Sequence, residues 1–275
     1  MTDSNSQSST PANLESGELR FHAYASRVFG NTRQLRVWLP PGYSSRQNEG
    51  RRYPVFYLND GQNLFDAATA FAGVDWRVGE TLSRLIAELR VPPMIVAGID
   101  NATVERIREF LPYKALLPPV PKPLGKHYPD FLMREVMPFI ERTYRVAHGA
   151  KNTGLGGSSL GALISLYTAI TRPGVFGRLL LESPSLFVSN RQLLRESRAA
   201  ASWPQRVFLG VGTRESGNRE RDQRIVDDVK SLAHTLHLAG LREKRLRVEI
   251  QEGASHCEGA WAERFPAAVE FLFGK

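Results

Sequence analysis

The sequence predicts an α/β fold in which a mostly parallel central sheet has an antiparallel start and helices on both faces. Short apolar runs alternate with stretches of apolar residues at helical spacing from residue 19 onward, which is typical of crossover units and a parallel sheet. The first two strand-like segments have no helix between them, which favours antiparallel pairing there. A chain of 275 residues has room for one large α/β domain.

Each element follows from a local pattern. Apolar and polar residues alternate over 19–26 and 34–39, as in half-buried strands. Short apolar runs predict further strands over 54–58 and 94–99. Four more strands are expected over 153–156, 179–181, 206–211 and 246–251. Helical spacing predicts helices over 76–90, 128–144, 160–170, 192–200, 222–239 and 260–273. Residues 100–127 contain five prolines and no clear period, which indicates a functional loop or disorder.

Composition excludes several classes of function. The 36 Lys and Arg outnumber the 28 Asp and Glu, but they are spread along the chain, which favours a solvated basic surface over nucleic-acid binding. The single cysteine, Cys257, excludes an internal disulfide and a multi-cysteine zinc site. The sequence has no His-Glu-x-x-His, no Walker loop and no complete Gly-x-Gly-x-x-Gly. We therefore expect no nucleic-acid partner, no metal and no cofactor.

The N-terminal segment and the distribution of apolar residues predict the domain boundaries and the cellular location. Residues 1–18 are rich in Ser, Thr, Asn and Pro, which predicts a disordered tail without the apolar core of a signal peptide. No linker divides the rest, so one catalytic domain is expected over 19–275. No segment approaches the roughly 18 consecutive apolar residues of a membrane span. We expect a cytoplasmic protein with no membrane partner, and its oligomeric state stays open.

The sharpest motif is Gly157-Ser158-Ser159-Leu160-Gly161. It fits Gly-x-Ser-x-Gly, the turn that holds a nucleophilic serine between a strand and a helix. Side chains on either side of the sharp apex would collide, so both flanking positions favour glycine. A predicted strand precedes the motif and a predicted helix follows it. Ser159 is therefore the candidate nucleophile, and Ser158 fits the pattern less well.

A serine nucleophile needs a general base, and three histidines follow Ser159 in the chain. His234 and His237 lie three residues apart within a helical pattern. No third metal ligand is indicated, so surface positions are favoured over a metal pair. His256 instead follows the strand 246–251 after the short loop 252–255 and precedes the last helix. That is the position of a catalytic base in the chain order serine, acid, histidine.

An acid that orients the histidine should follow the strand 206–211. The next segment is Gly-Thr-Arg-Glu-Ser-Gly-Asn at 212–218, in which Glu215 is the best-placed carboxylate. Asp222 is the second choice and Glu220 the third. A surface or helix-capping role for Glu215 is the alternative.

Acyl transfer also needs two donors for the oxyanion. The amide of Leu160, directly after the nucleophile, should supply one. The other should come from the loop after the third strand, which is residues 59–66. Gly61 lets that backbone turn toward the site, so the amide of Gln62 is the candidate, against a plain Asp-Gly turn.

With these residues in place, the chain resembles the Putative esterase family of α/β-hydrolases. That family includes enterochelin (siderophore) esterases, feruloyl esterases, S-formylglutathione hydrolases and mycolyltransferases. The matching segments occur in order and are RVWLPPGY at 36–43, YPVFYLNDGQNLFD at 53–66, GIDN at 98–101 with Arg106 and Glu109-Phe110 after it, GGSSLGAL at 156–163, GTRE at 212–215 and SHCEGAWAERF at 255–265.

The resemblance implies the α/β-hydrolase fold and a serine carboxylic-ester hydrolase that works through an acyl-enzyme. It implies the same triad, Ser159, His256 and Glu215. It also implies that Asp60, Arg106 and Trp261 line or support a cleft for a small-molecule ester, with siderophore-type or aryl esters as candidates. The alternatives are an acyltransferase that uses the same acyl-enzyme, and a non-catalytic binding protein of the same fold.

Substrate specificity does not follow from the triad, because one fold serves many functions. Two groups of residues could bear on it. Arg106 and Arg108 would favour an anionic or catecholate ester. Aromatic residues form an acyl pocket or, as such residues more often do, part of the core; they are Phe65, Phe71, Trp76, Tyr113 and Trp261.

Overall fold

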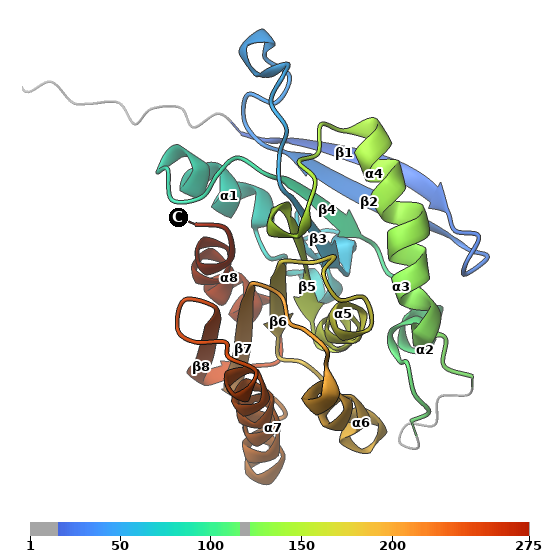
Figure 1. Cartoon of the computed structure of the whole chain (residues 1–275), viewed down its shortest axis with the longest axis vertical. Helices are drawn as coiled ribbons and strands as arrows, with labels where there is room; N and C mark the ends of the chain where they lie inside the picture. Colours follow the sequence, from blue (N-terminus) through green and yellow to red (C-terminus); the bar gives the residue numbers. More distant parts are fainter. Residues whose placement is uncertain (1–15, 116–121, 275) are drawn as a thin grey trace, which may run out of the picture.

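The computed structural model describes residues 16–115 and 122–274, which form an eight-stranded sheet flanked by helices (Figure 1). The strands are β1 (Glu18–Ala25), β2 (Thr32–Leu39), β3 (Val55–Asn59), β4 (Ile95–Ile99), β5 (Thr153–Ser158), β6 (Arg178–Glu182), β7 (Arg206–Arg214) and β8 (Leu246–Ser255). Their order across the sheet is β1-β2-β4-β3-β5-β6-β7-β8. β1 pairs antiparallel with β2 and β2 with β4, and every later pair is parallel. The predicted antiparallel start is confirmed.

The helices lie on both faces of this sheet. The α-helices are α1 (Val78–Ala87), α2 (Arg106–Phe110), α3 (Tyr128–Phe131), α4 (Met137–Thr143), α5 (Leu160–Thr171), α6 (Val188–Glu196), α7 (Arg219–Leu238) and α8 (Glu258–Phe273), with a π-helical turn (Leu132–Val136) between α3 and α4. Short 3₁₀ turns occupy Arg46–Asn48, Gly61–Asn63, Phe71–Gly73, Thr103–Glu105, Gly125–His127, Ala150–Asn152 and Ser197–Ala199.

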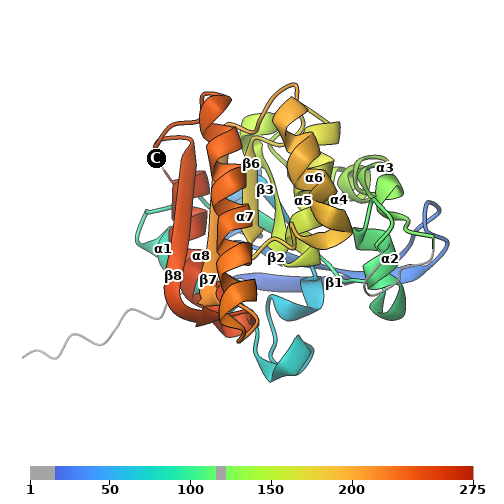
Figure 2. The same cartoon turned by 90° about the horizontal axis from the view of Figure 1, so that it is seen from below.

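Two apolar layers fill the space between sheet and helices. Side chains alternate along a strand, so in β3 the residues Val55 and Tyr57 face one layer and Phe56 and Leu58 face the other. The first layer packs against α2 to α7, and the second packs against α1 and α8 (Figures 1 and 2). The inner strands β3 and β4 are buried along their whole length, which is why they appear in the sequence as continuous apolar runs.

Three segments differ from the sequence predictions. Residues 100–127 hold the helix α2 and two 3₁₀ turns, with 116–121 outside the described residues. The strand β8 continues through 252–255, which were predicted as a loop, and a register shift opposite Gly212 and Arg214 accommodates it. The helix α6 begins at Val188, four residues before the predicted start at 192. The backbone of residues 189–191, near its start, has left-handed angles.

The predicted N-terminal tail falls mostly outside the described residues. Of its positions 1–18, only 16–18 are described, and Glu18 begins β1. In the part of the chain that the structure describes, no helix combines the length and apolar character needed to cross a membrane.

Candidate active site

Ser159 occupies the sharp turn between β5 and α5, with φ 56° and ψ −121°. This backbone conformation is unfavourable for a residue with a side chain. A Cβ added at Gly157 would lie 3.0 Å from the Gly161 carbonyl carbon, so a side chain there would crowd the backbone of the turn. The Ser159 amide donates a hydrogen bond to the Glu182 carbonyl at 2.9 Å, which ties the turn to the end of β6. The structure thus confirms the strand-turn-helix context predicted for the motif.

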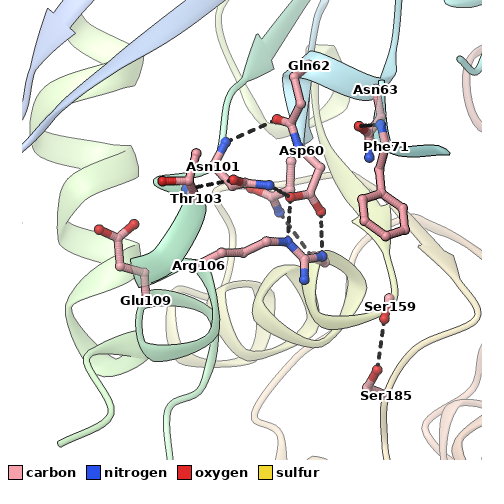
Figure 3. A network of polar contacts seen from close by, with 12 residues as sticks. Asp60, Gln62, Asn63, Phe71, Asn101, Thr103, Arg106, Glu109, Ser159 and Ser185 are labelled. Atoms are coloured by element: carbon pink, nitrogen blue, oxygen red, sulfur yellow. Dashed lines mark hydrogen bonds and ion pairs between the residues drawn. The ribbon is translucent and has the colours of Figure 1, made fainter. Parts of the chain in front are cut away.

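Ser159 opens onto a cavity of about 570 Å³ at the carboxyl ends of the parallel strands. His256 lines the same cavity, as does the more deeply buried Ser158. The Ser159 hydroxyl lies 3.2 Å from the Ser185 hydroxyl (Figure 3). Among the described residues, no hydrogen bond joins Ser159 directly to His256.

The His256 ring is held by Glu215, whose Oε2 lies 2.5 Å from Nδ1. The other oxygen, Oε1, accepts hydrogen bonds from the Ser183 hydroxyl at 2.7 Å and the Gly212 amide at 2.6 Å. Burial by itself would raise the pKa of Glu215, but the bonds from His256, Ser183 and Gly212 outweigh it and lower the pKa. Glu215 is therefore a buried, ionised carboxylate directed at the imidazole.

The other two acids considered for this position lie elsewhere. Asp222 accepts hydrogen bonds from the Ser216 amide and hydroxyl at 2.6 and 2.7 Å, in the first turn of α7. Glu220 is exposed on the same helix. Of the three candidates, the structure brings Glu215 to the histidine.

The ring of Trp261 packs edge-on against His256, with 5.0 Å between ring centroids. Its Nε1 donates to the Ser183 hydroxyl at 2.9 Å, and that hydroxyl in turn donates to Glu215. Trp261 thus contacts the imidazole directly and its acid through Ser183, and it also lines the cavity.

The two amides predicted to bind an oxyanion lie at the same end of the sheet. Leu160 is the first residue of α5 and Gln62 lies in the 3₁₀ turn after β3. Neither amide donates a hydrogen bond to another described residue. Gln62 lines the cavity beside Ser159.

Asp60 anchors the turn that carries Gln62. It adopts a left-handed backbone conformation, with φ 58°. Its carboxylate binds Arg106 through two hydrogen bonds of 2.7 and 2.8 Å and accepts a third from Asn101 at 2.7 Å (Figure 3). Asp60 and Arg106 both line the cavity, and the charge of Arg106 is matched by Asp60.

The aromatic and basic residues considered for substrate binding separate into two groups. Phe71 and Trp261 line the cavity, and Phe71 is 75% exposed. Trp76 is core, and packs against Trp261 with 5.9 Å between ring centroids. The others, Phe65, Tyr113 and Arg108, do not line this cavity.

Four polar residues around the site were not predicted from the sequence, and they are Asn63, Ser183, Ser185 and Glu258. Ser183 and Ser185 follow β6 directly, so their place after a parallel strand could have marked them. Asn63 bonds the Phe71 amide at 3.0 Å through Oδ1 and Glu258 at 3.2 Å through Nδ2. Among the described residues, no cluster of three His, Cys, Asp or Glu side chains could hold a metal ion.

Comparison with known proteins identifies relatives of this architecture. The sequence model of the family described as "Putative esterase" matches residues 26–272. The uncharacterized protein YbbA of Bacillus subtilis is 26% identical over 88% of this chain and 93% of its own length. The ferri-bacillibactin esterase BesA of the same organism is 26% identical over 73% of this chain and 71% of its own.

Solved structures show the same fold. The enterobactin esterase FES of Shigella flexneri, crystallised in the presence of enterobactin, superimposes with a TM-score of 0.71 at 20% sequence identity. The match covers 93% of this chain but spans 58% of the length of the Shigella enzyme.

Proposed function

The chain belongs to the Putative esterase family and is a carboxylic ester hydrolase with the α/β-hydrolase fold, and on this premise we propose that Ser159, His256 and Glu215 carry out the reaction. The observation that carries the proposal is the 2.5 Å contact between Glu215 and His256 at the cavity into which the strained Ser159 turn opens. Strain at a functional turn and a buried acid behind an imidazole are the marks of an activated serine.

Acylation begins when the Ser159 Oγ attacks the ester carbonyl carbon and His256 takes the hydroxyl proton. The Ser159 hydroxyl contacts the Ser185 hydroxyl in this structure, and triad hydrogen bonds often tighten only when substrate is bound. Glu215 holds the proton on Nδ1, so Nε2 is the nitrogen that accepts. The new C–O bond leaves negative charge on the carbonyl oxygen, which the amides of Leu160 and Gln62 stabilise.

Collapse of this intermediate breaks the bond to the alcohol oxygen. His256 donates its proton to that oxygen, and the alcohol leaves an acyl-enzyme on Ser159. Water then adds to the acyl carbon while His256 takes one of its protons. The second collapse returns the proton to Ser159 and releases the carboxylic acid.

The substrates we propose are siderophore-type or aryl esters. Two observations support this choice. The exposed ring of Phe71 and the indole of Trp261 line the cavity, where they offer flat apolar surfaces to an aromatic group. The similarity to a ferri-bacillibactin esterase and to an enterobactin esterase points to the same class.

Labelling with a fluorophosphonate probe tests the proposal directly. Intact-mass analysis and peptide mapping should find one adduct on the peptide that contains Ser159. Ser159→Ala should abolish the adduct, and the neighbouring Ser158→Ala should retain it as the matched control. A folded wild-type protein that forms no adduct, or an adduct on Ser158, would contradict the proposed nucleophile.

The acceptor of the acyl group is tested by product analysis. With an aryl ester in water, the acid should be the product, and an added alcohol should divert only a minor share to a new ester. If the new ester dominated at a low alcohol concentration, the enzyme would be a transferase with the same acyl-enzyme.

A further inference from the structure

A buried carboxylate that the proposed reaction does not use faces the active-site cavity. Glu258 is the first residue of α8 and lies two positions after His256 in the chain. Only 6% of its surface is exposed. It lines the cavity together with Ser159 and His256. A carboxylate that is taken out of water needs hydrogen-bond donors to replace those it has lost.

The protein supplies few such donors. Asn63 Nδ2 donates to Oε1 at 3.2 Å. The nearby cation, Arg106, donates two hydrogen bonds to the carboxylate of Asp60, through Nε and Nη2. Glu258 forms no ion pair with any residue that the structure describes. An ionised carboxylate accepts about four hydrogen bonds, so the side of Glu258 that faces the cavity has capacity for a ligand.

The electrostatic environment agrees with this arrangement. Burial raises the pKa of Glu258, and the charge of Asp60 adds to this effect. The backbone hydrogen bond at the helix start and the charges of His256 and Arg106 lower the pKa, but the net shift is upward. A hydrogen-bond donor placed in the cavity would relieve part of the cost of keeping this carboxylate ionised.

The position relative to His256 indicates which half of an ester meets Glu258. In the proposed mechanism His256 donates a proton to the departing alcohol oxygen, so the alcohol half lies on the His256 side of the cavity. Glu258 follows His256 by two residues and shares that cavity. We propose that Glu258 is a specificity-determining residue that accepts a hydrogen bond from a hydroxyl group on the alcohol half of the substrate. This inference rests on the proposed function.

A purely structural role for Glu258 makes a different prediction. Through Asn63, Glu258 is linked to the amide of Phe71, so it could act by holding the loop that carries Gln62. Loss of that support would slow the hydrolysis of all esters alike. Loss of hydroxyl recognition would instead slow the hydrolysis of hydroxylated esters selectively.

Two benzoate esters that differ in one group separate these roles. They are 2-hydroxyethyl benzoate and propyl benzoate, in which a methyl group replaces the hydroxyl. The wild-type kcat/KM, measured by acid release, should favour the hydroxyethyl ester by about tenfold or more, since a site that binds a hydroxyl discriminates against its absence. Glu258→Gln keeps an acceptor for Asn63 but removes the charge, and should lower this preference to about threefold or less.

Glu263→Gln is the matched control, because Glu263 is an exposed glutamate on the same helix outside the cavity. It should leave both rates and their ratio unchanged. An equal loss for both esters in Glu258→Gln would overturn the inference. A wild-type enzyme that hydrolyses both esters equally well would also overturn it. This second test uses the wild type alone, so it does not depend on the folding of a variant. Either result would leave Ser159 catalysis intact, since propyl benzoate hydrolysis and fluorophosphonate labelling report on that separately.

Discussion

Glu215 and His256, 41 residues apart in the chain, meet with 2.5 Å between Oε2 and Nδ1. The carboxylate comes from the end of β7 and the imidazole from the turn after β8, two neighbouring parallel strands. Because parallel strands end at the same edge of the sheet, their following segments converge there. The pair therefore depends on the register of β7 and β8 as much as on either residue.

The proposed triad should behave as a unit when its members are removed. Ser159→Ala and His256→Ala should each lower kcat by about 10⁴- to 10⁶-fold, and the double variant by little more. The reason is that the base has no task without the nucleophile. Steady-state kinetics on one aryl ester measures the three variants, and losses that multiply would count against the triad.

Replacing Glu215 by Gln should lower kcat by about 10³- to 10⁴-fold with little change in KM. The amide cannot stabilise the imidazolium and can bind the wrong tautomer of His256. Glu220→Gln, on the exposed face of α7, is the control and should retain full activity. A Glu215→Gln enzyme with near wild-type kcat would remove Glu215 from the mechanism.

Glu215 should also contribute stability that depends on pH. Its pKa is lowered in the folded protein relative to the ordinary value of 4.5. A group with a lowered folded pKa stabilises the protein above its unfolded pKa, and this contribution is lost as pH falls through the folded value. The free energy of unfolding of the wild type, relative to Glu215→Gln, should thus be greatest near neutral pH and decline below about pH 4.5. Urea denaturation of both proteins across pH 3–7 measures it, and a difference that grows toward low pH would refute the assignment.

The Asp60–Arg106 pair should stabilise the turn after β3. Asp60→Asn leaves the Arg106 charge without its partner. Because the Arg106 side chain is 24% exposed, water offsets part of the loss, and we expect a decrease of about 2–3 kcal/mol in the free energy of unfolding.

Two comparisons give that prediction its control. The exposed pair Glu18–Arg20 should contribute less than about 1 kcal/mol when Glu18 is replaced by Gln. The double variant Asp60→Asn/Arg106→Met should lose less than the sum of its single variants, since it leaves no unpaired charge. Additive losses would show that the pair is not coupled.

The parts of the site that local sequence predicts are those with local causes. The turn at Ser159 is visible because a strained apex favours glycine at 157 and 161, both within two residues of it. The alternation of strands and helices is visible because burial imposes a period on each segment. The place of His256 after the last strand follows from chain order.

Other parts depended on contacts between distant segments. Residues 100–127 have no clear period, yet they contain α2, because its short helix is held by packing against α5 and by the bond of Arg106 to Asp60. Glu258 looks like an ordinary acid at a helix start, a position where acids are common for reasons of the helix dipole. Its exposure to the cavity becomes apparent only when α8 is placed beside the turn after β3.

The sequence by itself thus determined the order of elements, the strained serine and the histidine that follows the last strand. The tertiary structure decided which of three acids meets that histidine, that the charge of Arg106 is matched by Asp60, and that Glu258 faces the cavity. The physical reason is that periodicity and turn chemistry act over a few residues, whereas these contacts depend on the register and packing of strands and helices far apart in the chain.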